Sequence, residues 1–323
     1  MHTNVKKIVK HKVILAPLSG VSDLSFRLIC RELGAPFCFF EMMDARSFMY
    51  SHERSMRLAR TTEKDIPVAA QLLGADPKYM LDAAEKLTDC TDISLLDVNA
   101  ACPAKKVIKK KAGAALLNSP KRLGRILKTL SSKLPIPVSV KLRIGFGGRD
   151  LREAVKTAKI CQENGASIVF LHGRTVSQGY AGSVDYPAIR AVKKALSVPL
   201  YGSGDILSAS LAKRMFDETG CDGILVARGA LGNPWIFKSI QKYLKNGTVA
   251  RSPTLAVKKR VLKKHLSYIA RYKETSPACT LGIMGKIAMW YLKGMPGASR
   301  MRERIVRVSS TDELYGLIDG LKG

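Results

Sequence analysis

The sequence predicts an α/β protein with two domains: a (β/α)8 TIM barrel over residues 1–240, followed by a small all-helical domain over residues 241–323. Three observations lead to this fold class. Eight short apolar runs rich in β-branched residues alternate with helix-compatible segments, which is typical of a parallel sheet covered on both faces. Eight such repeats over about 230 residues match the count and size of a closed barrel. No further strand-like run follows Trp235-Ile236-Phe237.

The expected strands are short, apolar and bounded by residues that favour turns. Because nearly all of their positions are apolar, these strands should be buried on both faces, as the strands of a parallel sheet are. In chain order they are Val13–Leu18, Phe37–Met43, Val68–Leu73, Ser94–Asn99, Val138–Arg143, Ser167–His172, Val198–Tyr201 and Gly223–Ala227.

Helices are expected between most of these strands, and several have start and stop signals. Asp76-Pro77 and Ser119-Pro120 each place an N-cap residue before a proline in the first turn. Glycines follow three of the segments, where they can act as C-caps. The helices are Asp23–Leu33, Pro77–Leu87, Pro120–Leu130, Leu151–Gln162, Pro187–Leu196 and Ala209–Phe216, and the glycines are Gly34, Gly165 and Gly220.

Beyond a linker at Lys245–Thr248 the pattern is helical only. Residues 241–323 contain 17 Lys and Arg but 5 Asp and Glu, which gives a net charge of +12. The helices are expected at Leu255–Tyr272, Leu281–Leu292, Arg300–Val308 and Asp312–Leu321. Four lysines of the first helix fall broadly on one side, where we expect them to contact RNA phosphates: Lys258, Lys259, Lys263 and Lys264.

A doubly wound open sheet is the alternative fold. Its dinucleotide-binding fingerprint, G-x-G-x-x-G, is absent, because Gly202-Ser203-Gly204 is followed by Leu207 at the last glycine position. Gly285-Lys286 likewise lacks the upstream glycine of a P-loop. The barrel is therefore the favoured fold.

The composition favours a cytoplasmic protein that binds RNA. The chain carries 54 Lys and Arg against 26 Asp and Glu, and the net charge of +28 attracts polyanions. A lysine-rich organism would also produce basic proteins, so RNA is favoured only because the charge is unevenly placed. No apolar run approaches the roughly 18 residues of a membrane span, and the start of the chain is unlike a signal peptide. Seven scattered cysteines and five isolated histidines, with no C-x-x-C pair, argue against disulfides and a metal site.

Residues at the C-terminal ends of barrel strands form the active site. Lys141 lies within an apolar strand, where a lysine is seldom buried without a function, and His172 ends the next strand. Gly204 and Arg228 follow the seventh and eighth strands, whose loops form the common phosphate site of such barrels. This pattern indicates a planar, phosphorylated cofactor. FMN fits better than pyridoxal phosphate, because Lys141 has no obvious partner acid for a pyridine nitrogen.

A polar stretch follows the fourth strand. Asn99, Cys102 and Pro103 stand at its start, and five lysines come next: Lys105, Lys106, Lys109, Lys110 and Lys111. A lone cysteine at a strand end is usually a small buried hydrophobe. The spacing Asn-x-x-Cys-Pro-x-x-Lys favours a functional interpretation, because it resembles the active-site loop of the flavin-dependent tRNA-dihydrouridine synthases.

The resemblance covers residues 13–240 and is closest to the bacterial B-type subfamily. The basic tail, with Trp290–Gly294, is similar to the helical RNA-binding domain of that family. Two positions depart from the family pattern: Ala101 replaces the usual glycine before the cysteine, and Ser203 replaces an asparagine before Gly-Asp. The other matching motifs occur in family order at Leu15–Val21, Ala70–Leu72, Asp97–Asn99, Val140–Arg143, His172–Thr175, Gly204–Ile206 and Ala227–Gly229.

The resemblance implies that NADPH reduces FMN, which reduces the C5=C6 bond of specific uridines in tRNA to 5,6-dihydrouridine. Cys102 would be the catalytic residue that gives a proton to C5, since a free thiol is protonated at neutral pH. The uracil would have to leave its base stack to reach the barrel. Asn99, Arg143 and Arg174 would bind the substrate. The cofactor would contact Pro17, Leu18, Ser19, Gln71, Lys141, His172, Ser203, Gly204, Asp205, Ala227 and Arg228.

Rival functions stay open at this point. An FMN enzyme of the same fold could reduce a free small molecule, as dihydroorotate dehydrogenases do, but it would not need a domain of net charge +12. A basic RNA-binding protein with an inert barrel would leave Lys141 and Cys102 unexplained. A dihydrouridine synthase could also act on ribosomal RNA. We expect tRNA as the partner, no metal, no membrane contact and a monomeric protein.

Overall fold

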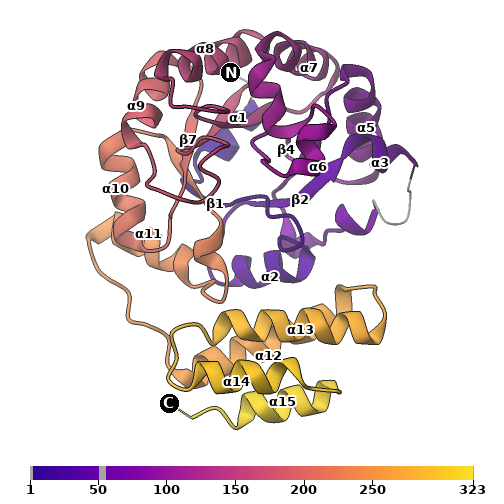
Figure 1. Ribbon diagram of the computed structural model, residues 1–323, viewed down its shortest axis with the longest axis vertical. Coiled ribbons are helices and arrows are strands. Elements are labelled where there is room, and N and C mark those ends of the chain that lie inside the picture. Colours follow the sequence, from indigo (N-terminus) through magenta and orange to yellow (C-terminus); the bar gives the residue numbers. More distant parts are fainter. Residues whose placement is uncertain (1–2, 51–55, 323) are drawn as a thin grey trace.

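The computed structural model describes residues 3–50 and 56–322, and its centre is a closed barrel of eight parallel strands (Figure 1). The strands follow one another around the barrel in chain order, and the first strand pairs with the last. The expected (β/α)8 fold is therefore confirmed. Met1 and His2, which belong to the start judged unlike a signal peptide, lie outside the described residues.

The strands agree closely with the sequence-based expectation. β1 is shorter than expected, because Pro17 has no N–H with which to continue the ladder. β7 starts after Pro199 for the same reason and extends to Ser203. The observed strands are β1 (Val13–Leu15), β2 (Cys38–Asp44), β3 (Val68–Leu73), β4 (Leu95–Ala100), β5 (Val138–Arg143), β6 (Ile168–His172), β7 (Leu200–Ser203) and β8 (Gly223–Val226).

A ring of helices surrounds the strands (Figure 1). The Asp76 carboxylate accepts hydrogen bonds from two backbone N–H groups of its helix, as expected, whereas the Ser119 side chain makes no such bond. Gly220 ends its helix in the left-handed conformation. The ring consists of α2 (Leu24–Glu32), α5 (Pro77–Cys90), α7 (Pro120–Lys133), α8 (Leu151–Glu163), α9 (Tyr186–Ala195), α10 (Ala209–Thr219) and α11 (Ile236–Asn246).

Several short helices were not expected from the sequence. They are too short to show a periodic pattern of apolar residues. α1 carries Val5 and Ile8, which are buried against Phe39 and Phe170 inside the barrel, so it closes one end of the barrel. The short helices are α1 (Thr3–Val9), α3 (Ala45–Tyr50), α6 (Lys105–Lys109), η1 (Glu63–Asp65), η2 (Gly113–Asn118) and η3 (Arg228–Ala230).

The interior of the barrel changes from apolar to polar along the strands. Because side chains alternate along a strand, every second residue points inward. On β6, Ile168 and Phe170 belong to the apolar interior cluster, and the next inward residue is His172. On β4, Leu95 belongs to the same cluster and is followed inward by Asp97. The inward polar residues thus gather at the C-terminal half of the barrel.

The chain after the barrel is helical, and its helices pack around their own core (Figure 1). α11 contacts α10 and β1 and therefore belongs to the barrel. The boundary expected after residue 240 lies inside this helix, and residues 245 and 246 of the expected linker are helical. The following helices are α12 (Leu255–Tyr272), α13 (Pro277–Tyr291), α14 (Ala298–Val306) and α15 (Thr311–Asp319), and their core includes Leu266, Met284, Ile287, Leu314 and Ile318.

The helical part docks onto α2 of the barrel through α12. The Phe26 ring lies 5.7 Å from the ring of His265 and 6.3 Å from that of Trp290. Ion pairs flank these rings: Lys273 lies 2.7 Å from Asp23, and Lys264 lies 2.6 Å from Glu32. The interface therefore combines buried rings with charge pairs at its edge.

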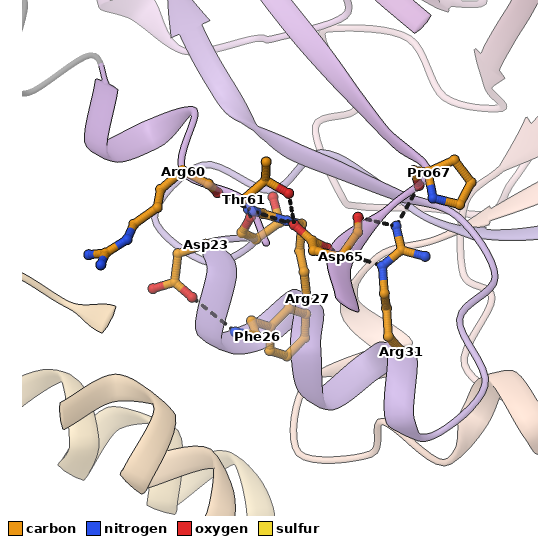
Figure 2. A network of polar contacts seen from close by, with 9 residues as sticks. Asp23, Phe26, Arg27, Arg31, Arg60, Thr61, Asp65 and Pro67 are labelled. Carbon is orange, nitrogen blue, oxygen red and sulfur yellow. Dashed lines mark hydrogen bonds and ion pairs between the residues drawn. The ribbon is translucent and has the colours of Figure 1, made fainter. Parts of the chain in front are cut away.

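A buried polar network supports the barrel side of this interface. Figure 2 shows Asp65 between Arg27 and Arg31 of α2. The Asp65 carboxylate accepts bonds of 2.8 Å and 3.1 Å from the two Nε atoms, and Arg27 donates to the Arg60 carbonyl at 2.7 Å. The Arg60 guanidinium lies 2.7 Å from the Glu274 carboxylate of the helical part. The network thus positions Arg60 for its contact across the interface.

Three of the four lysines expected to contact RNA are engaged within the protein. Lys259 donates to the Asp319 carbonyl at 2.7 Å, and Lys263 pairs with the Asp319 carboxylate. Lys264 pairs with Glu32 of the barrel. These side chains therefore join α12 to its neighbours. The sequence showed that they share one side of a helix, but the helices that cover this side come from elsewhere in the chain.

Candidate active site

A cavity lies at the C-terminal ends of the barrel strands and brings together almost all of the predicted site residues. Arg174 is the exception, since it is not among the residues that line the cavity. Met42 and Tyr180 line it but were not predicted. The predicted lining residues are Pro17, Leu18, Ser19, Gln71, Asn99, Cys102, Lys141, Arg143, His172, Ser203, Gly204, Asp205, Ala227 and Arg228.

A chain of hydrogen bonds leads from a buried carboxylate to the Cys102 backbone. Asp97 accepts a bond of 2.7 Å from Gln71 Nε2 and another of 2.7 Å from Ser139 Oγ. Gln71 Oε1 accepts a bond of 2.7 Å from Asn99 Nδ2. Asn99 Oδ1 in turn accepts from the Cys102 N–H at 2.9 Å and from the Ala101 N–H at 3.1 Å.

The direction of this chain follows from its first member. Asp97 accepts from Gln71 Nε2 through one oxygen and from Ser139 Oγ through the other, so the Gln71 amide is held with its nitrogen toward Asp97. Gln71 must then present its oxygen to Asn99, and Asn99 must present its own oxygen to the cysteine loop. Burial raises the pKa of Asp97 to about 7, even though the bonds from Gln71 and Ser139 oppose this shift. The sequence indicated that Gln71 needs partners but could not identify them.

The Asn99 amide is fully engaged in this arrangement. Its second N–H group faces the Met42 sulfur at 3.2 Å. The predicted contact between Asn99 and the uracil edge stays a prediction, and it requires that one of these bonds be exchanged. Ala101, which replaces the usual glycine, is buried and does not have a positive φ, so its methyl group is accommodated.

Lys141 and His172 line the cavity from neighbouring strands, and His172 lies opposite Arg143 in the register of β5 and β6. Burial, followed by the charge of Arg143, lowers the pKa of Lys141 to about 8. Burial and the nearby cations, Lys141 first among them, lower the pKa of His172 to about 2, so its imidazole is neutral. His172 Nε2 is buried at the cavity wall without a hydrogen-bond partner in the described part of the chain. A buried polar atom at a cavity wall can hydrogen-bond to a group that binds in the cavity.

Asp205 organises the loops after β7 and β8. It lies 2.8 Å from Arg228 and pairs with Arg174, and the bond from Arg174 lowers the pKa of Asp205. The Arg228 guanidinium also lies over the Tyr180 ring, 4.4 Å from the ring centre. Gly229 allows close approach of two loops, because a Cβ there would lie 2.0 Å from the Ile206 carbonyl oxygen.

Arg143 and Arg174, both predicted to bind substrate, hold the loops around the cavity. Arg143 is buried and donates to the carbonyls of Ala101 at 3.0 Å and Thr175 at 2.8 Å. Arg174 is buried too and donates to the Ala181 carbonyl at 3.1 Å as well as pairing with Asp205. Their contacts come from loops whose path is not visible in the sequence. A direct role in substrate binding stays a prediction for both.

The turn after β1 forms another wall of the cavity. Ser22 Oγ accepts a bond of 2.9 Å from the Leu18 N–H, and the Gly20 N–H donates to the Glu41 carboxylate. Glu41 is buried on β2, and burial raises its pKa. Sequence reasoning missed Glu41, because an acidic residue within an apolar run gives no sign of its distant partner.

The described part of the chain contains neither a cluster of metal ligands nor a membrane-spanning helix. Within residues 3–50 and 56–322 no group of three or more His, Cys, Asp or Glu side chains could hold a metal ion. In the same residues no helix has the length and apolar character needed to cross a membrane.

Comparison with known proteins identifies a family. The family model described as dihydrouridine synthase (Dus) matches residues 14–319. The tRNA-dihydrouridine synthase B of Pasteurella multocida is 34% identical over 313 residues, which are 97% of this chain and 93% of that protein. The tRNA-dihydrouridine synthase B of Vibrio parahaemolyticus is 37% identical over 298 residues, which are 91% of this chain and 90% of that protein.

Solved structures support the fold. The histamine dehydrogenase from Rhizobium sp. 4-9 matches 80% of this chain and 49% of its own, with a TM-score of 0.57 and 11% identity. A 2-naphthoyl-CoA reductase matches 72% of this chain and 50% of its own, with a TM-score of 0.57 and 12% identity. These likenesses extend only to the fold, whereas the family model and the relatives span nearly the whole chain. The chain belongs to the dihydrouridine synthase family.

Proposed function

We propose that this protein reduces the C5=C6 bond of specific uridines in tRNA to 5,6-dihydrouridine, with FMN as cofactor and NADPH as reductant. One observation carries the proposal: the cavity at the barrel mouth brings Cys102, Lys141 and His172 together. Family membership and the tRNA substrate named in its relatives support the choice of reaction.

The cavity residues fit a flavin. Bound FMN would supply the hydride that reaches C6 of the uracil ring. Lys141 offers an ammonium group that can stabilise negative charge on a reduced flavin. His172 Nε2 is buried, lacks a partner and can hydrogen-bond to a ring edge. The backbone around Gly204 and Gly229 can approach a phosphate, and Arg228 can pair with it after releasing Asp205.

Cys102 supplies the proton in this proposal. Its side chain lines the cavity, and its backbone N–H is held by Asn99 at 2.9 Å. The thiol can transfer its proton to C5 as the hydride reaches C6, which completes the addition across the double bond. The Arg143 bond to the Ala101 carbonyl holds the same loop from its other side.

The helical part and the overall charge suit an RNA substrate. The net charge of the chain is +28. Lys259 and Lys263 are bonded to Asp319 within the protein, whereas α14 and the residues next to it expose arginines that can contact RNA phosphates. We propose that residues 255–322 bind tRNA, and that the protein acts as a monomer. These exposed arginines are Arg300, Arg302, Arg304 and Arg307.

The proposal is tested with purified protein, NADPH and an unmodified tRNA transcript. The protein should carry non-covalent FMN and should produce dihydrouridine, measured by mass spectrometry of the digested RNA. A free uridine nucleoside should not be reduced. A protein that neither carries nor takes up FMN would contradict the cofactor assignment, and reduction of a free small molecule instead of RNA would contradict the substrate.

A further inference from the structure

The segment that follows Cys102 leaves the cavity rim and returns to it. The Ala114 N–H donates to the Cys102 carbonyl at 3.1 Å, so the two ends of this loop meet beside the cysteine. Gly113 has a φ of +60°, and a Cβ there would lie 2.9 Å from the Cys102 carbonyl oxygen. The closure of the loop therefore depends on a glycine at this position.

The loop is anchored as well as closed. Val107 of α6 is buried in a small apolar cluster with Leu73 and Ala112, and Cys102 packs against this cluster. Lys110 lies 3.0 Å from Asp44 at the end of β2. Side chains on the outer face of α6 are thus carried by a backbone that is fixed relative to Cys102.

Four positive charges on this loop are exposed and have no acidic partner. We call Lys105, Lys106, Lys109 and Lys111 the rim lysines. Each is exposed, and none makes an ion pair or side-chain hydrogen bond within residues 3–50 and 56–322. Between Pro103 and Ala114 the chain contains no acidic residue. The four charges therefore add on the loop that begins at Cys102 and Pro103, which line the cavity.

The local backbone indicates that this charge has a use. Lys111 has a φ of 57°, in the left-handed region that glycine or asparagine usually occupies. Such a conformation is unfavourable for a lysine, because its Cβ lies too close to the following carbonyl oxygen. Lys105 and Lys106 stand at the start of α6, where the helix dipole disfavours positive charge. A sequence selected only for stability would place other residues at these positions.

We propose that the rim lysines bind the phosphates of the RNA strand that carries the target uridine. This inference rests on the proposed function. A uracil that enters the cavity must leave its stack, while its phosphate and the neighbouring phosphates remain outside, at the rim. The five residues of α6 span about 7.5 Å, so the rim lysines can reach adjacent nucleotides of one strand. Their contacts would hold the extruded nucleotide beside Cys102.

A triple variant tests the inference: Lys105→Gln, Lys106→Gln and Lys109→Gln, which keeps good helix formers in α6. The matched control is Lys128→Gln, Lys133→Gln and Lys159→Gln. These control lysines are exposed near the C-terminal ends of α7 and α8, at the opposite end of the barrel from the cavity. Both variants carry the same loss of three charges, so only the place of the charge differs.

Binding of an unmodified tRNA transcript is measured over a series of KCl concentrations for the wild type and both variants. Each phosphate contact to a single strand contributes about 0.7 to the slope of log K against log salt. Loss of three contacts should therefore reduce the magnitude of the slope by about 2 in the rim variant. The control variant should show less than half of this change.

The outcomes separate the possible errors. Equal slopes in the two variants would overturn the inference while the proposed function stands. A raised KM for NADPH in the rim variant, with an unchanged RNA slope, would assign the lysines to the 2′-phosphate of NADPH and would also overturn it. If the wild type neither binds the transcript nor makes dihydrouridine, the proposed function fails and the inference fails with it.

Discussion

A buried carboxylate sets the direction of the hydrogen bonds that reach the Cys102 loop. Asp97 is fully buried and bonds to Gln71 and Ser139, and Gln71 passes the orientation on to Asn99. The amide groups of Gln71 and Asn99 can each satisfy both of their hydrogen-bond partners in only one orientation. Asp97 is therefore a positioning residue, which acts on the cysteine loop through two amide side chains.

Replacement of Asp97 by leucine should lower dihydrouridine formation by about 10²-fold, because the Gln71 amide loses its fixed orientation and the cysteine loop can shift. Asn should be tolerated at this position, since its oxygen can face Gln71 while its nitrogen faces the Ser139 hydroxyl. The control is Ser139→Ala, which leaves the Asp97–Gln71 bond of 2.7 Å in place. Turnover of a tRNA transcript is the measurement, and equal losses in Asp97→Leu and Ser139→Ala would contradict the positioning role.

At the scale of residues, the sequence predicts which side chains line the cavity better than it predicts their hydrogen-bond partners. Lys141 and His172 were recognised because polar groups in apolar strands stand out, and barrel geometry places strand ends around one cavity. Most bonds of Arg143 and Arg174 could not be predicted, because their acceptors are backbone carbonyls of loops, apart from the Asp205 carboxylate that pairs with Arg174. Tyr180 was missed for a related reason, since a loop tyrosine has no periodicity to mark it.

At the scale of elements, the strands and long helices were predictable and the short helices were not. β3 and β5 have the bounds that the sequence predicts, because β-branched and other apolar residues alternate with or outnumber the polar ones in both runs. α6 has five residues, of which three are lysines, and two more lysines follow it, so the single buried Val107 does not stand out in the sequence. Its position depends on the Cys102–Ala114 bond, which no local pattern shows.

The contact between α2 and α12 should make stability depend on pH. Burial lowers the pKa of His265 to about 4, against 6.5 in an unfolded chain. Below pH 6.5 the unfolded chain therefore binds a proton that the folded protein does not, so the free energy of unfolding falls as the pH falls from 6.5 toward 4. Above pH 6.5 the stabilisation is fully present.

Urea unfolding at pH 7 and pH 5 tests this expectation in the wild type and in His265→Phe, which keeps a ring against Phe26. The wild type should lose about 2 kcal/mol more stability than the variant between the two pH values, at about 1.4 kcal/mol per pH unit below 6.5. Parallel losses in the two proteins would show that His265 does not control acid stability.

At the scale of the whole molecule, the position of α11 decides where the barrel ends. The helix runs to Asn246, and Gly247 ends it in the left-handed conformation. Gln241 donates to the Gly34 carbonyl at 2.9 Å, and Leu244 packs against the barrel core. The sequence predicts the boundary after residue 240, whereas α11 continues for six residues beyond it, to Asn246.

A chain that ends at residue 251 should therefore be more stable than one that ends at residue 240. The shorter chain loses the Gln241 hydrogen bond and the Leu244 contact, and each loss should lower the free energy of unfolding by about 1 kcal/mol. The two losses together correspond to a melting temperature that is lower by about 4–8 °C. Thermal unfolding of the two truncated chains is the comparison. Equal melting temperatures would show that the end of α11 does not stabilise the barrel.

The proposed reaction depends on Cys102 acting at the step that completes uridine reduction. Wild-type protein and Cys102→Ala, each loaded with FMN and reduced beforehand, are mixed with an unmodified tRNA transcript, and dihydrouridine is measured over a single turnover. Cys90→Ala is the control, since Cys90 is an exposed cysteine at the end of α5. Cys102→Ala should bind FMN and tRNA normally but should form dihydrouridine about 10²–10⁴ times more slowly. A rate equal to that of the wild type and of Cys90→Ala would contradict the account.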